Sequence, residues 1–98
     1  MKREDHLKTD HFVWNKEYND VHKWIDGCFP KYASTNPYMH WLERHHIEAI
    51  NKKYGEFSIE YNVAYVHILM DVLSHLEMAY VPRTSKEVKT ILETEGLI

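Results

Sequence analysis

The chain has 98 residues, which suits one domain, and a formal net charge of −3. No basic run exceeds Lys52-Lys53, so we expect no nucleic-acid partner, because phosphate binding needs clustered positive charge. A single cysteine, Cys28, excludes the intramolecular disulfide that usually stabilises a small secreted domain. We find no signal peptide and no membrane span, and therefore expect a cytoplasmic protein without a membrane partner.

The pattern of polar and apolar residues predicts an all-α fold in a single domain, residues 1–98. An N-terminal arm, residues 1–14, is polar except for Phe12-Val13-Trp14, and we expect it to dock through these three side chains. After the arm we predict a small bundle of about four helices, at residues 16–26, 36–54, 59–80 and 85–94.

Capping residues mark the ends of the first two predicted helices. Asn15 is placed to cap the first helix, and Gly27 is placed to end it. Asn36 followed by Pro37 is a typical start for the second helix, and Gly55 stops it. Both helices are therefore expected to run without interruption between these residues.

The third predicted helix begins after Ser58 and has a wide apolar arc, which indicates a central helix packed against more than one neighbour. Its opening residues, 57–61, alternate between apolar and polar, so a short strand is the alternative there. Pro82 then breaks the chain. Residues 84–87 have the pattern of a capping box, with Thr84 as the cap of the last helix.

Eight histidines are the most unusual feature of the composition. Three of the candidate ligands follow the spacing His67-x3-Asp71-x3-His75, and residues four apart lie on one face of a helix. Imidazole and carboxylate together suit zinc, iron, nickel or manganese. Because the three residues lie opposite the apolar arc, the alternative is that they face solvent.

Two shorter patterns also combine a histidine with a carboxylate. Glu43-x2-His46 has the spacing of a ligand pair in di-iron bundles, although the second pair that such a site needs is missing. His46 falls inside the apolar face of its helix, so the alternative is a core histidine that is hydrogen-bonded locally. His22-x3-Asp26 can orient a ring, or it can be a local pair at the flank of the first helix.

Other catalytic templates are missing from the sequence. There is no adjacent His-Asp pair of the kind that metal-dependent phosphohydrolases use, no H-E-x-x-H and no glycine-rich phosphate loop. Cys28 follows a predicted helix end, where nothing obvious lowers its pKa, so we do not expect a catalytic thiol.

Several short motifs occur together along most of the chain: Val21-His22, Asp26, His40, His45-His46, Gly55, His75 and Val81-Pro82. In this combination the chain resembles a family of small, histidine-rich, helical bacterial and phage proteins, a domain of unknown function. It departs from the family pattern in the first 15 residues and at Val21, where the family has isoleucine. The resemblance implies a helical domain with a shared histidine set: His22, His40, one of His45 or His46, and His75.

Our leading hypothesis is a small protein that binds a divalent transition metal (zinc, iron or nickel) through histidine and carboxylate side chains. If it is an enzyme, a metal-activated water that attacks a small or phosphorylated substrate is the simplest mechanism. The sequence does not identify a general base. The candidate ligands, in order of preference, are His46, His22, His75, His45, Asp71, Glu43 and His67.

The alternative hypothesis is an interaction protein without chemistry of its own. Such a protein would inhibit a protein partner or sequester a small ligand, as compact phage counter-defence proteins do. Three Trp and seven Tyr are many aromatic residues for so small a core, so we also expect a homo-oligomer, most simply a homodimer.

Overall fold

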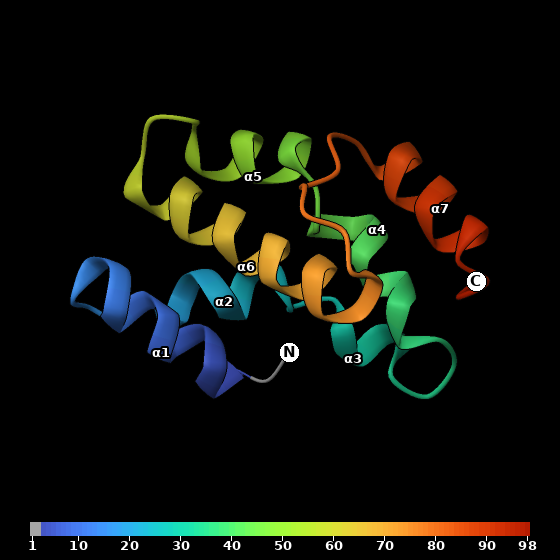
Figure 1. Ribbon diagram of the computed structural model, residues 1–98, viewed down its shortest axis with the longest axis horizontal. Coiled ribbons are helices and arrows are strands. Elements are labelled where there is room, and N and C mark those ends of the chain that lie inside the picture. Colours follow the sequence, from blue (N-terminus) through green and yellow to red (C-terminus); the bar gives the residue numbers. More distant parts are fainter. Residues whose placement is uncertain (1–2) are drawn as a thin grey trace.

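The computed structural model describes residues 3–98, and within that range the chain is all-helical with no strand (Figure 1). The predicted fold class is confirmed, but the predicted number of helices is not. The elements are α1 (Arg3–Trp14), α2 (Asn19–Ile25), α3 (Phe29–Tyr32), the 3-10 helix η1 (Pro37–His40), α4 (Trp41–Arg44), α5 (Ile47–Tyr54), α6 (Ile59–Leu76) and α7 (Ser85–Thr94).

The long helix α6 is the centre of the molecule (Figure 1). It contacts α5 on one side and α2 on another, while α1 contacts α2, and α7 packs on α4. This arrangement agrees with the wide apolar arc of α6, which needs more than one neighbour to cover it. The buried apolar core consists of Val21, Ile25, Trp41, Ile50, Val63, Ala64, Ile68, Val72, Val81, Val88 and Leu92.

Helix α6 begins where its cap predicts. The hydroxyl oxygen of Ser58 accepts a hydrogen bond from the Tyr61 amide at 3.1 Å, and the strand alternative for residues 57–61 is wrong. The helix ends at Leu76 and not at Tyr80, because Glu77 has a left-handed backbone conformation with φ of 55°. No described helix is long and apolar enough to cross a membrane.

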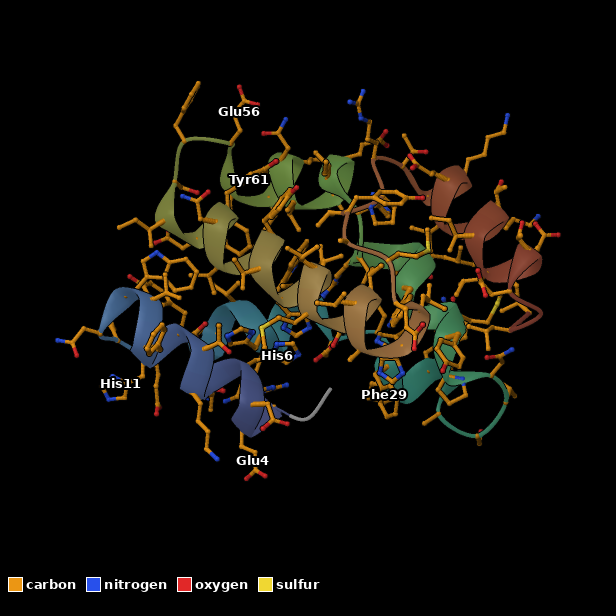
Figure 2. The ribbon with its side chains drawn as sticks, in the orientation of Figure 1. Glu4, His6, His11, Phe29, Glu56 and Tyr61 are labelled. Atoms are coloured by element: carbon orange, nitrogen blue, oxygen red, sulfur yellow. The ribbon has the colours of Figure 1, made fainter. Side chains whose placement is uncertain are left out.

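The predicted N-terminal arm is a helix, α1, and of its three apolar end residues only Trp14 packs against the core. Phe12 is 92% exposed and Val13 is 54% exposed, whereas His6 and Asp10 are buried. Figure 2 shows that His6 points from α1 toward the interior, while other side chains of the helix point away from the molecule. Asn15, with φ of 56°, donates its amide to the His11 carbonyl, so it ends α1 instead of capping the next helix.

The predicted helix at 36–54 is interrupted in its middle, at His45 and His46. The backbone of His46 is extended, and the amides of Ile47 and Glu48 donate to carbonyls of the segment before α7. This segment is 35 residues further along the chain, at Pro82. The break therefore depends on a tertiary contact, and it leaves His45 buried between α4 and α5.

The first predicted helix, 16–26, is shorter than expected: α2 begins at Asn19, and Asp26 rather than Gly27 is its C-cap. The ends predicted at Asn36, Gly55 and Thr84 are confirmed. The side chain of Asn36 accepts from the Tyr38 amide, and Gly55, with φ of 81°, ends α5. Helix α7 covers the predicted residues 85–94, with Thr84 accepting from the Glu87 amide. These caps act within four residues of the chain, which is why the sequence predicts them well.

Candidate metal centre

Four buried or nearly buried side chains point their ligand atoms at one place beside α6. Asp26 follows α2, His45 lies between α4 and α5, and His67 and Asp71 lie one turn apart on α6. Their ligand atoms all lie within 4.8 Å of one another. Nε2 of His45 and Nε2 of His67 each lie 3.2 Å from Asp71 Oδ2. The same two nitrogens each lie 3.4 Å from Asp26 Oδ1.

These separations match the edges of a metal coordination shell. Nitrogen and oxygen ligands lie about 2.0–2.2 Å from zinc, which places neighbouring ligands of a tetrahedral ion roughly 3.4 Å apart. The set contains two imidazoles and two carboxylates, a combination that suits zinc, iron, nickel or manganese. The site therefore has both the spacing and the donor chemistry for a divalent transition metal.

A hydrogen-bonded chain behind the site determines which nitrogen of His67 faces it. Nε2 of His22 lies 2.6 Å from Asp10 Oδ2, and Nδ1 of His22 lies 2.7 Å from Nδ1 of His67. Burial, which outweighs the hydrogen bond with Asp10, lowers the pKa of His22 to about 4. His22 is therefore neutral near pH 7, and its single proton is on Nε2, donated to the Asp10 carboxylate. Nδ1 of His22 must then accept the proton of His67 Nδ1.

This tautomer leaves a lone pair on Nε2 of His67. The atom is buried, has no hydrogen-bond partner among the described residues, and faces the carboxylate oxygens of Asp26 and Asp71. A lone pair beside two negative oxygens is repulsive unless a cation lies between them. Burial acts to lower the pKa of His67, but the two carboxylates outweigh it and raise the pKa. A proton can fill the position, and a metal ion fills it with all four ligands at once.

Asp71 is held in place from the side opposite the ligand cluster. Its Oδ1 lies 3.1 Å from Nε2 of His6 on α1, while its Oδ2 faces the two ligand histidines. Burial acts to raise the pKa of Asp71, but the contacts with His45, His6 and His67 keep the pKa far below its usual range. The carboxylate is therefore ionised at neutral pH, as a metal ligand must be.

Asp26 and His40 form the side of the cluster that is nearest to solvent. The side chain of Asp26 is 26% exposed, and its Oδ1 lies 3.5 Å from Nε2 of His40. His40 donates Nδ1–H to the Pro37 carbonyl, so its Nε2 also presents a lone pair to a carboxylate. Burial acts to raise the pKa of Asp26, but contacts with His40, His45 and His67 lower it. His40 is thus a fifth candidate ligand.

A second group of histidines, His6, His22 and His67, is close-packed but does not form a second site. The rings of His6 and His67 are stacked, with centroids 3.8 Å apart and planes 12° apart. Metal ions bind in the plane of an imidazole, along the lone pair, so two stacked rings do not aim at one ion. His6 and His22 therefore support Asp71 and His67 from behind.

The structure brings together three of the residues that the sequence singled out, namely His45, His67 and Asp71. The alternative that the α6 pattern faces solvent is wrong for His67, which is 0% exposed, and for Asp71, which is 4% exposed. His22 lies behind His67, and His75 is exposed at the other end of the pattern, with Nδ1 3.5 Å from the Tyr38 hydroxyl.

Two of the predicted metal ligands, His46 and Glu43, lie outside the ligand cluster. His46 caps α5, where its Nδ1 accepts from the Ala49 amide and its Nε2 bonds the Leu42 carbonyl. Glu43 is on the surface and accepts from Tyr32 and Lys31. Neither belongs to the converging group.

Asp26, His40, Asp10 and His6 are not among the predicted metal ligands. The sequence pairs Asp26 only with His22, and His40 enters only through the family resemblance. Asp10 and His6 are i and i−4 on α1, a helical spacing that would have signalled one shared face. The residues around this pair are polar, so the segment lacks the apolar periodicity that predicts a helix.

A pocket opens beside the ligand cluster, with a volume of about 650 Å³. Two cluster carboxylates, those of Asp26 and Asp71, belong to its lining, so the cluster is reached from this side. The lining consists of Arg3, Asp26, Phe29, Pro30, Pro37, Tyr38, His40, Trp41, Asp71 and His75.

Comparison with protein-family models, with curated proteins and with solved structures gave no match for the chain.

A substitution at His46 separates capping from metal binding. We expect His46→Ala to lower the free energy of unfolding by about 1 kcal/mol, because the Ala49 amide loses its acceptor. His46→Asn, which can also cap, is expected to lose less. Urea denaturation of the metal-free protein measures both variants, and metal content should stay at the wild-type value. A loss of metal from both variants would contradict this assignment.

A substitution at Asp10 tests the hydrogen-bonded chain behind His67. We expect Asp10→Asn to weaken metal binding roughly 10-fold or more, because a neutral amide no longer holds the His22 proton and polarises His67 less. Asp20→Asn is the matched control, since Asp20 is an exposed aspartate on α2. Competition with a chelator measures the affinity of each protein. Equal affinities for the two variants would show that the chain has no effect on the metal.

Proposed function

We propose that this protein binds one divalent transition metal ion through Asp26, His45, His67 and Asp71, and uses it to hydrolyse a small substrate. The observation that carries the proposal is the buried Nε2 of His67, which faces two carboxylate oxygens at 3.2 and 3.4 Å without a hydrogen bond. His40 contacts Asp26 at 3.5 Å but lies outside the converging group.

The charge of the ligand set supports the binding of a divalent ion. Two neutral imidazoles and two carboxylates carry two negative charges, which balance the two positive charges of the ion. The low pKa of Asp26 and of Asp71 keeps both carboxylates ionised near neutral pH.

The position of the pocket supports hydrolysis. Stacked histidines close the site on the side of α1, whereas Asp26 and Asp71 meet the pocket on the other side. Four side chains alone would complete a tetrahedral shell, so hydrolysis requires an ion that takes a fifth ligand, a water on the side of the pocket. A metal lowers the pKa of a coordinated water and so supplies a nucleophile at neutral pH. His67, held by His22, keeps the donor geometry of such a site rigid.

Elemental analysis of untagged protein, after reconstitution with zinc and removal of the excess, tests the proposal. We expect about one zinc per chain in the wild type and strong loss in His67→Ala and Asp71→Asn. His11→Ala is the matched control, because His11 is an exposed histidine on α1, and it should retain the metal. Circular dichroism checks that each variant is folded. A folded wild type that retains no zinc, iron or nickel would refute the proposal.

The alternative, an interaction protein, is supported by apolar side chains on the surface. Phe12 is 92% exposed and Phe57 is 96% exposed. Isolated exposed apolar residues are common, so this support is weaker than that for the metal centre. Under this alternative we expect a homodimer by light scattering and no bound metal.

A further inference from the structure

We propose that the pocket beside the metal centre binds a phosphate monoester whose organic part is an aromatic ring, an inference that rests on the proposed metal site. The lining of the pocket combines two kinds of side chain. Asp26, Asp71 and Arg3 are charged, while most of the other lining residues are aromatic rings and prolines. Its volume of about 650 Å³ lies within the usual range for small-molecule sites.

The charged part of the lining is suited to an anion once a metal is bound. The metal neutralises Asp26 and Asp71, which leaves Arg3 as the one Lys or Arg side chain in the described lining. Nη1 of Arg3 donates to Asn19 Oδ1 at 3.2 Å, and Nε is buried without a partner among residues 3–98. The guanidinium thus retains unused donors, and the fork of an arginine matches the oxygens of a phosphate group.

The aromatic part of the lining is suited to an aromatic ring of the ligand. Phe29, Tyr38 and Trp41 line it, with Tyr38 and Trp41 edge to face at 5.4 Å. Phe29 is 42% exposed although it is a large apolar residue, so it presents free ring surface at the pocket. Planar ligands stack on such surfaces, and each aromatic contact contributes beyond its buried area.

The reaction that we propose for the metal centre and its pocket is hydrolysis of the phosphate ester. The oxygen of the metal-activated water attacks phosphorus, the bond between phosphorus and the ester oxygen breaks, and that oxygen leaves with a proton as the alcohol. The products are an aromatic alcohol and inorganic phosphate. Arg3 belongs to the lining that would hold the phosphoryl oxygens. Its positive charge would stabilise the negative charge that develops on these oxygens in the transition state.

Three probes separate the parts of the proposal in calorimetric titrations of zinc-loaded protein. Phenylphosphonate carries both ring and anion, methylphosphonate carries the anion alone, and benzyl alcohol carries the ring alone. We expect the Kd of phenylphosphonate to be roughly tenfold below that of methylphosphonate, and no detectable binding of benzyl alcohol. Phenyl phosphate should be hydrolysed by the same protein, with release of inorganic phosphate.

Two variants test the charged and the aromatic parts of the lining separately. Arg3→Gln should weaken both phosphonates by about tenfold or more, whereas Phe29→Ala should weaken phenylphosphonate only. Lys31→Gln is the control for the loss of a positive charge, because Lys31 is exposed on α3 outside the pocket lining, and it should change neither Kd.

The outcomes distinguish this inference from the proposed function. Protein that holds zinc but binds the two phosphonates equally, or neither of them, overturns the substrate assignment and leaves the metal centre standing. Binding of benzyl alcohol as tight as that of phenylphosphonate overturns the anion site. Protein that holds no metal refutes both proposals together.

Discussion

An excess of zinc is expected to raise the melting temperature of the metal-free protein strongly at pH 7.5. A ligand that binds only the folded state at a thousand times its Kd adds about 4 kcal/mol to the free energy of unfolding. For a domain of this size, that corresponds to roughly 15 °C or more. Differential scanning calorimetry with and without zinc measures the shift. His67→Ala should remove most of it, because one ligand and the link to His22 are lost together.

The pH dependence of this shift has a definite sign. The carboxylates of Asp26 and Asp71 raise the pKa of His67 against the effect of burial, so a proton competes with the metal for Nε2. Since protonated His67 is favoured as the pH falls, metal affinity must fall in the same direction. The zinc-induced shift should therefore be smaller at pH 5.5 than at pH 7.5. A shift that grows toward pH 5.5, or that persists in His67→Ala, would contradict the assigned ligand set.

Asp71→Asn is expected to be the most damaging conservative change when zinc is present. The carboxylate serves the metal centre through Oδ2 and contacts His6 through Oδ1, and it is 4% exposed. Removing one partner from such a buried charged group typically costs about 3–5 kcal/mol. Chemical denaturation in zinc measures the loss, and zinc content measured on the same sample shows whether the metal has left.

Glu43→Gln is the matched control for Asp71→Asn. It makes the same chemical change to a carboxylate that sequence analysis also proposed as a ligand. Glu43 is at the surface, where it accepts from Tyr32 and Lys31, so we expect a loss of less than about 1 kcal/mol and unchanged zinc content. A comparable loss in the two variants would show that burial at the cluster has no special role.

Patterns that act over a few residues were predicted correctly from the sequence. Helices that begin after Ser58 and Thr84 are capped by those hydroxyls. Asn36 caps η1 and Gly55 ends α5, as expected for the two ends of the second predicted helix. Each of these signals joins a side chain to a backbone group at most four residues away, so no tertiary structure is needed to complete it.

The break at His46 shows where such reasoning stops. The sequence around it continues a helical pattern, yet the amides of Ile47 and Glu48 donate to the segment at Pro82. These hydrogen bonds to a distant segment take the place of the hydrogen bonds of a continuous helix. His46 is therefore the N-cap of α5 and not a residue of the apolar face. The same break directs His45 into the interior, where it meets Asp71.

The all-α class, most helix ends and the placement of His67 and Asp71 one turn apart on α6 follow from local patterns in the chain. The side chains that join these two residues follow from the packing of distant segments. Asp26 and His45 come from separate segments, and His6 is 65 residues from Asp71, its partner. Helical spacing places residues on one face but does not say what covers that face. Here α2 packs on α6, and His6 of α1 contacts His67 and Asp71, so the face that polarity alone would assign to solvent is buried.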